Sequence, residues 1–377
     1  MADEFKNTGS SRADRPLSFK GADYGVPQGT EEDWRFTPLE RVEDFFADSF
    51  AGTGLTVSAH GGVELVEVGR DDPRLGSTIP PEDRVGATTW ESFDKAYVLS
   101  IPKDEKVADE VIVTLNGSGG SGVVPAHLYV EAQRHSEATV ILDHVGGGKL
   151  AEGVEINLED GAHLTLVTLQ DWDEKAVHAS SHRIKVGRDA TLKHIVVSLG
   201  GDLIRITSSV DFAGPGGDVT MLGAYFVDEY QHMEHRLFVD HNVPNAKSNV
   251  AYKGALQGTE AHSVWVGDVL IGKDAIGTDT YELNRNLILT EGASADSVPN
   301  LEIETGEIEG AGHASATGRF DDEQLFYLMA RGIPEDEARR LVVRGFFAEL
   351  INQIGVESVQ NKLMEKIEEE LNLTGEL

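Results

Sequence analysis

A short β-rich unit recurs through the middle of the sequence, and this recurrence is the feature that most limits the folds open to the chain. Each copy has an acidic or glycine turn, a small residue and a run of strand-forming residues. The copies are residues 136–141, 160–166 and 188–192, and less clearly 217–220, 273–276 and 291–294. Ala138, Ala162 and Ala190 are spaced by 162 − 138 = 24 and 190 − 162 = 28 residues, with no helical periodicity.

A drifting period of this length predicts a β-solenoid. One coil cannot bury its own apolar strand face, so neighbouring coils must stack. An antiparallel β-sandwich also gives short strands and turns, but its repeat is shorter, which makes it the second interpretation. We therefore expect a mainly β protein whose core, residues 96–318, is a stacked solenoid.

Two segments precede this core. Residues 1–30 are polar and rich in Gly and Ser, a composition typical of an extended, flexible tail. Residues 31–95 are expected to form an N-terminal helical region. Within it, residues 37–40 (Thr-Pro-Leu-Glu) resemble a capping box, and Leu39, Val42, Phe45 and Phe46 fall on one face. This pattern predicts a short amphipathic helix over residues 38–48.

After Gly318 the hydrophobic period becomes helical, so residues 319–377 are expected to form a C-terminal helical domain. Asp321 and Asp322 suit the start of a first helix and Gly332 its end, while Pro334 suits the start of a second. A third helix is expected from about residue 357. The predicted inward residues of the second and third helices are Ala338, Leu341, Val342, Gly345, Phe346, Leu350, Ile354, Val359, Leu363 and Ile367.

The composition argues against several classes of partner and chemistry. The chain has 65 acidic and 32 basic residues, a formal charge of −33, which argues against nucleic acid or an anionic membrane as a partner. No apolar run approaches the ~18 residues of a membrane span, and the N-terminus lacks signal-peptide blocks, so a cytoplasmic protein is expected. The chain contains no cysteine. Disulfides, thiol nucleophiles and cysteine-ligated clusters held by this chain alone are therefore excluded.

Histidines supply the candidate metal ligands. His178 and His182 have the spacing of helical ligands, but strand-like neighbours favour a non-metal role. His232 and His235 would lie on opposite faces of a strand and are expected at the surface or between coils. His313 is expected in a Gly/Ala/Ser loop, residues 310–318, at the junction of the β and helical regions. From the residues alone, a solvated or structural histidine remains the better interpretation there.

No complete catalytic constellation is visible. With 65 acidic residues, carboxylate pairs arise by accident, so none indicates a glycosidase. The sequence lacks a phosphate loop, a Gly-x-Ser-x-Gly elbow and a credible dinucleotide fingerprint.

Several ordered motifs resemble the SufB/SufD family of iron–sulfur cluster assembly proteins. The C-terminal set comprises residues 299–303 (PNLEI), His313, and residues 325–328 (LFYL), 331–333 (RGI), 337–338 (EA) and 345–346 (GF). The upstream set comprises residues 241–244 (HNVP), Ser248, and residues 253–256 (KGAL), 278–280 (TDT) and 284–289 (NRNLIL). Residues 32–39 (EDWRFTPL) resemble an N-terminal motif of the SufD branch, and the likeness extends from about residue 20.

This resemblance implies a right-handed parallel β-helix flanked by helical termini. It also implies a non-catalytic scaffold in a complex of one SufB, one SufD and two copies of the ATPase SufC, which would dock on helices within residues 321–371. ATP binding by SufC would then open a cluster-assembly site between SufB and SufD. The SufD branch is favoured because SufB is expected to supply a cysteine, and this chain has none.

By the same resemblance, His313 matches an interface histidine that helps to hold a transient iron–sulfur cluster with a partner cysteine. The chain departs from the family at Ala311, where relatives often have cysteine. The family allows a reduced flavin in the whole complex, but no flavin motif occurs here. It also leaves open whether the free chain forms a homodimer. The alternative function is a β-helical polysaccharide-active enzyme or carbohydrate-binding protein.

Overall fold

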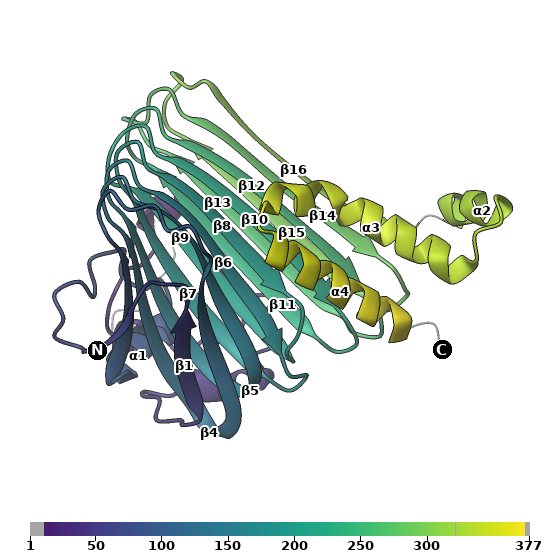
Figure 1. Cartoon of the computed structure of the whole chain (residues 1–377), viewed down its shortest axis with the longest axis horizontal. Coiled ribbons are helices and arrows are strands. Elements are labelled where there is room, and N and C mark those ends of the chain that lie inside the picture. The colour runs from purple at the N-terminus through teal and green to yellow at the C-terminus, as the bar shows by residue number, and fades with distance from the viewer. Residues whose placement is uncertain (1–10, 321, 374–377) are drawn as a thin grey trace.

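A computed structural model describes residues 11–320 and 322–373 (Figure 1). The strands are β1 (Leu55–His60), β2 (Leu65–Gly69), β3 (Lys95–Ile101), β4 (Val111–Ala132), β5 (Glu137–Leu158), β6 (His163–Trp172), β7 (Val177–Val186), β8 (Thr191–Ser198), β9 (Leu203–Phe212), β10 (Asp218–Val227), β11 (His232–His241), β12 (Lys247–Leu256), β13 (His262–Ile271), β14 (Asp279–Ile288), β15 (Ser294–Ile303) and β16 (Gly310–Arg319). The α-helices are α1 (Arg84–Ser92), α2 (Asp322–Ala330), α3 (Glu335–Ile354) and α4 (Glu357–Leu373).

The strands build a parallel β-solenoid of about eight turns, which confirms the predicted mainly β fold. One wall stacks β7, β9, β11, β13 and β15, and the other stacks β6, β8, β10, β12, β14 and β16. The long strand β5 belongs to both walls, since it pairs with β6 through residues 137–146 and with β7 through residues 149–158. Each coil therefore contributes one strand to each wall (Figure 1).

The structure confirms the repeat, but its first period is 26 residues rather than the predicted 24. Glu137 pairs with His163, a step of 163 − 137 = 26 residues, so Ala138 faces Leu164 rather than Ala162. The residue before each strand of this wall is often small and buried, as at Ser136, Ala162, Ala190 and Ala246. A small side chain is needed there because successive coils turn directly above one another.

Both faces of each wall are covered over most of its length, except at the last strands, β15 and β16. Inside the solenoid lies the main core, with Leu164, Val219 and Trp265 among its members. The outer face of the even-numbered wall packs against α3 and α4 (Figure 1). Ile195 and Phe347 are among the buried residues of this contact. Coverage on both sides explains why the strand sequences lack the clean alternation of a half-exposed sheet.

The N-terminal segment covers the outer face of the other wall. Trp34 and Phe45 pack there against Ala179 and Leu203. The predicted helix over residues 38–48 is wrong, because the chain forms two 3-10 turns, Leu39–Arg41 and Glu43–Phe46. The Thr37 hydroxyl does not cap a helix; it donates to Oε2 of Glu234 at 2.6 Å.

The segment predicted to be a flexible tail is partly held on the solenoid. Residues 1–10 lie outside the described residues. Beyond them, Arg12 pairs with Asp268 at 2.9 Å, and the guanidinium of Arg15 stacks 3.4 Å from the centre of the Phe238 ring. Residues 31–95 contain α1, β1 and β2, elements that the sequence pattern did not indicate.

The three predicted C-terminal helices are present as α2, α3 and α4. Gly332 has φ +88° at the end of α2, as expected of a helix stop. The inward face of α3 was partly misassigned: Val343, Phe347 and Ile351 are buried, whereas Leu341 is exposed. In α4 the predicted inward residues Val359, Leu363 and Ile367 are all buried, which confirms that face. Across residues 11–320 and 322–373, no helix is both long and apolar enough to span a bilayer.

Candidate functional site

His313 lies in strand β16, not in the predicted loop. The strand pairs with β14 over its whole length, and His313 is in register with Glu282. Backbone pairing with β14 orders a segment rich in Gly and Ala, residues that have little intrinsic preference for a strand. Tertiary pairing therefore overrides the local composition.

The solenoid is open at this end. Within the described part of the chain, β15 and β16 are the last strands of their walls, and no further coil stacks on them. Residues in register on neighbouring parallel strands point to the same face, and Glu282 is buried in the interior, so His313 is on the inward-facing side. His313 is nevertheless exposed, because none of the described residues covers the last coil.

The interior below the open end is polar. Ser297 donates to Oδ1 of Asn284 at 2.6 Å, and Asn286 donates to Ser297 at 3.1 Å. Tyr225 donates to Oδ1 of Asn286 at 2.5 Å. These hydrogen bonds join both walls, so the last coils are held by a polar network as well as by apolar packing.

Glu282 lies in the same polar interior but, unlike Asn284 and Asn286, makes no hydrogen bond to a described residue through its side chain. Its side chain is 1% exposed, and both carboxylate oxygens lack a hydrogen-bond partner in the structure. Burial, with a smaller contribution from the charge of Asp268, raises the pKa of Glu282 to about 8. A carboxyl group so near the open end and so poorly satisfied is unusual in a protein core.

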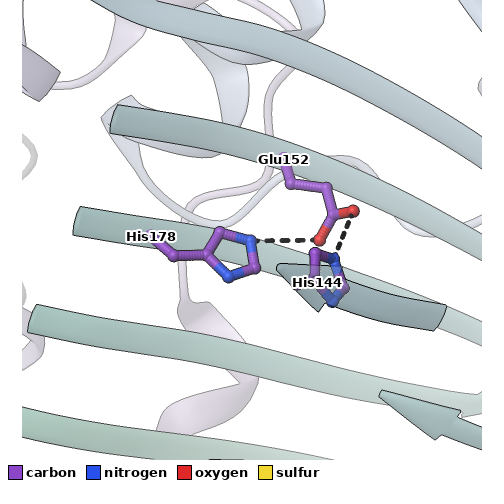
Figure 2. A group of neighbouring side chains, drawn as sticks. All are labelled: His144, Glu152 and His178. Atoms are coloured by element: carbon purple, nitrogen blue, oxygen red, sulfur yellow. Dashed lines mark hydrogen bonds and ion pairs between the residues drawn. The ribbon is translucent and has the colours of Figure 1, made fainter. Parts of the chain in front are cut away.

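A second polar cluster lies deeper, at the start of the solenoid. His144 and Glu152 come from the two halves of β5, and His178 comes from β7 (Figure 2). Nε2 of His144 lies 3.1 Å from Oε1 of Glu152, and Nε2 of His178 lies 3.2 Å from Oε2. The Ser180 hydroxyl also donates to Oε2, at 2.7 Å. All three cluster members are fully buried.

The hydrogen bonds fix the protons of this cluster. His144 Nδ1–H donates to the Leu169 carbonyl at 3.1 Å, while His178 Nδ1 accepts from Trp172 Nε1–H at 3.2 Å. His178 therefore donates to Glu152 from Nε2. Burial opposes the charged form of His144, but the charge of Glu152 outweighs it and raises the pKa of His144. Burial likewise opposes ionisation of Glu152, yet His144 keeps its pKa well below the usual range.

The cluster has metal-ligand geometry but is satisfied without a metal. One ligand atom from each of His144, Glu152 and His178 lies within 4.8 Å of the others. A metal ion at Nε2 of His178 would displace the proton from that nitrogen. The neutral ring would then carry its proton on Nδ1, which could no longer accept the hydrogen bond from Trp172. The arrangement fits a buried ion pair with a neutral second histidine better than a metal centre.

The other candidate histidines have structural roles. His182 does not join His178; its Nδ1 lies 2.9 Å from Nε2 of His194, and burial lowers its pKa to about 4. His232 does contact a neighbouring coil, with its Nδ1 3.2 Å from Nδ1 of His262. His235 is buried 3.0 Å from Ser198. Both histidines are buried, so of the two expected positions the surface is excluded and the position between coils remains.

Sequence reasoning missed Glu152 and Glu282, although both left a signal. In β5 the inward positions are Leu150, Glu152, Val154 and Ile156, so one acid interrupts an apolar series. Glu282 precedes Asn284 and Asn286 at inward positions of β14. A carboxylate at an inward strand position identifies both residues once the strand phase is known.

Comparison with known proteins identifies the chain's relatives. The model of the "SUF system FeS cluster assembly, SufBD core domain" matches residues 113–346, more than half of the sequence. The chain belongs to the SufB/SufD family. Within this family, an iron–sulfur cluster assembly SufBD family protein of Mycobacterium tuberculosis is 53% identical over 95% of this chain and 92% of its own length. SufD of Escherichia coli is 24% identical over 92% of this chain and 90% of its own length.

The SufB/SufD assignment confirms the family resemblance found in the sequence motifs. A counterpart in Mycobacterium leprae is 50% identical over 95% of this chain and 93% of its own length. These relatives connect the chain with iron–sulfur cluster assembly rather than with carbohydrates.

Proposed function

We propose that the chain is a non-catalytic scaffold subunit of a SUF complex, in which its open solenoid end pairs with SufB. The observation that carries this proposal is the position of His313, exposed on the inward-facing side of the last strand. A second solenoid stacking on β15 and β16 would cover that side chain. A transient cluster would then be held between His313 and a cysteine of SufB, because this chain has no thiolate of its own.

The C-terminal helices are the proposed docking surface for SufC. Phe326 and Tyr327 of α2 are 72% and 57% exposed, and Met329 and Leu341 add exposed apolar area. Such side chains are costly to leave in water and are typical of a protein interface. ATP binding by SufC would move this helical region and open the SufB–SufD interface.

Other features of the proposed complex follow from the family. The complex would act in the cytoplasm, and reduced flavin would be bound by the assembled complex rather than by a motif of this chain. Without SufB, the same open end would let two copies of the chain pair.

Co-purification tests the proposal. The chain is co-expressed with SufB and SufC, and the complex is examined for subunit stoichiometry and ATPase activity. A stable complex containing SufB and SufC, with ATPase activity altered relative to free SufC, supports the function. The absence of any complex, together with unchanged SufC activity, contradicts it.

A further inference from the structure

The first described residues of the chain lie across the outer face of the odd-numbered wall, which is formed by β7, β9, β11, β13 and β15. We call residues 12–15 the N-terminal strap. The guanidinium of Arg15 stacks 3.4 Å from the centre of the Phe238 ring, on β11. The guanidinium of Arg12 pairs with Asp268 of β13 at 2.9 Å. The strap therefore crosses the wall in the direction of its last strand.

Two hydrogen bonds extend this contact to β15. The backbone N–H of Arg12 donates to Oε2 of Glu302 at 3.3 Å, and the Asn300 amide donates to Oδ1 of Asp268 at 2.7 Å. Glu302 and Asn300 both belong to β15, which pairs with β13 alone among the described strands. Arg12 thus contacts the last strand of the wall once directly and once through Asp268.

The ion pair between Arg12 and Asp268 is largely shielded from water. The Asp268 side chain is 4% exposed, and that of Arg12 is 25% exposed. Burial raises the pKa of Asp268, and the charge of Arg12 opposes this rise. Removing the guanidinium would leave the carboxylate in a nearly dry position, which is more costly than losing an ion pair at the surface. The hydrogen bond from Asn300 to that carboxylate would be disturbed as a result.

The strap is anchored to the N-terminal region as well as to the solenoid. Nη2 of Arg12 lies 3.3 Å from Oδ1 of Asp33, and this carboxylate also pairs with Arg236 of β11 at 3.1 Å. Nε of Arg15 lies 3.1 Å from Oε1 of Glu82. Asp33 and Glu82 both precede the solenoid in the sequence. These contacts connect the N-terminal region with the coil at the open end.

We propose that the N-terminal strap is a conformational device that holds β15 in place, so that the N-terminal region controls the order of the open end. This inference rests on the proposed function for its consequence, because β15 is one of the two strands on which SufB would stack. A loosened β15 would offer SufB a poorer surface. By the same coupling, bound SufB would hold the strap more firmly on the wall.

Amide hydrogen exchange of the purified full-length chain tests whether the strap holds β15. The variants are Arg12→Ala and Arg15→Ala. The second tests the strap as a unit, because Arg15 stacks on β11, two strands away from β15. Arg134→Ala is the matched control, since it removes a surface ion pair with Asp160 in the turn between β4 and β5.

Peptides from two strands are compared in each protein. Those from β15 report on the last coil, and those from β8, which pairs with β6 and β10, report on the solenoid as a whole. We expect both strap variants to speed exchange in β15 by roughly tenfold or more and to leave β8 unchanged. Arg134→Ala should match the wild type in both strands.

Two results would overturn the proposal. In the first, β15 of either folded strap variant exchanges as it does in the wild type. In the second, exchange in β8 rises by the same factor as in β15, which would mark a loss of global stability rather than the release of one strand.

The affinity for SufB is measured separately with the same proteins. Arg12→Ala should bind SufB more weakly than the wild type and Arg134→Ala should not, and equal affinities would contradict the coupling to the partner. A wild-type chain that binds no SufB would instead contradict the proposed function. The exchange measurements would still decide whether the strap holds β15.

Discussion

Nε2 of His144 lies 3.1 Å from Oε1 of Glu152, while Nδ1–H of the same ring donates to the carbonyl of Leu169. Both ring nitrogens thus face acceptors, so the imidazole is held in its protonated form against an ionised carboxylate. This pair sits in the interior of the first coils, fully removed from water. Its consequences for stability are open to direct measurement.

Replacing Glu152 by Gln should destabilise the fold strongly. The change leaves His144 without its counter-charge in the core, and breaking a buried ion pair typically costs about 3–5 kcal/mol. Urea denaturation would measure the loss. Glu174→Gln is the matched control, because Glu174 is exposed in the turn between β6 and β7 and should change stability little.

Removing metal ions should not change the stability of the cluster formed by His144, Glu152 and His178. Since the protons of His144 and His178 already satisfy Glu152, we expect a chelator such as EDTA to leave the thermal midpoint unchanged. Thermal unfolding with and without EDTA checks this. A fall in the midpoint that is reversed by added zinc and absent in His178→Ala would establish a metal at the cluster instead.

Acid should weaken the contact between the solenoid and residues 76–78. Glu155 accepts from the backbone N–H groups of Gly76 and Thr78. Burial alone would raise its pKa, but the hydrogen bond from His127 and the charge of Arg183 lower that pKa from 4.5 to about 2. A lowered carboxyl pKa stabilises the fold above pH 4.5, and this stabilisation is lost as pH falls toward 2.

The shift corresponds to a contribution on the order of 3 kcal/mol. We expect the free energy of unfolding in urea to fall between pH 5 and pH 2.5 by about 2 kcal/mol more in the wild type than in Glu155→Gln, with the rest of the loss below pH 2.5. The variant should also be the less stable protein at pH 7. If the free energy of unfolding varied with pH in the same way in both proteins, the stabilising role of ionised Glu155 would be contradicted.

Substitution at the exposed face of α2 should separate docking from folding. Phe326 is 72% exposed, so Phe326→Ala should change the urea midpoint little but abolish retention of SufC. Leu350→Ala is the contrasting variant, because this buried side chain of α3 packs on the solenoid and its loss should cost about 2–5 kcal/mol. Undiminished SufC binding by Phe326→Ala would place the docking surface elsewhere.

The solenoid and the three C-terminal helices could be predicted because their signals are local. Small residues such as Ala162 and Ala190 mark each turn, and Gly332 marks a helix end. The buried face of α3 was harder to predict from the sequence. The helix contacts the solenoid with Val343 and Phe347, while the neighbouring Phe346 is partly exposed. Several hydrophobic stripes fit its sequence equally well.

The candidate site was predicted only in part. His313 was found through motifs, yet its strand depends on pairing with β14, which no local pattern of Gly, Ala and Ser indicates. Glu282 becomes visible only when the strand phase and the coil above it are known. The N-terminal 3-10 turns were missed because Thr37 donates to Glu234, almost two hundred residues away, instead of capping a helix.

The most direct test of the central account is the cluster content of the complex carrying His313→Ala. The complex is co-expressed with SufB and SufC, isolated anaerobically, and assayed for iron, sulfide and the visible absorbance of its cluster. We predict that His313→Ala assembles with normal stoichiometry but loses most of its cluster absorbance, because an exposed ligand is removed without disturbing the core. Wild-type cluster content in the assembled variant would contradict the account.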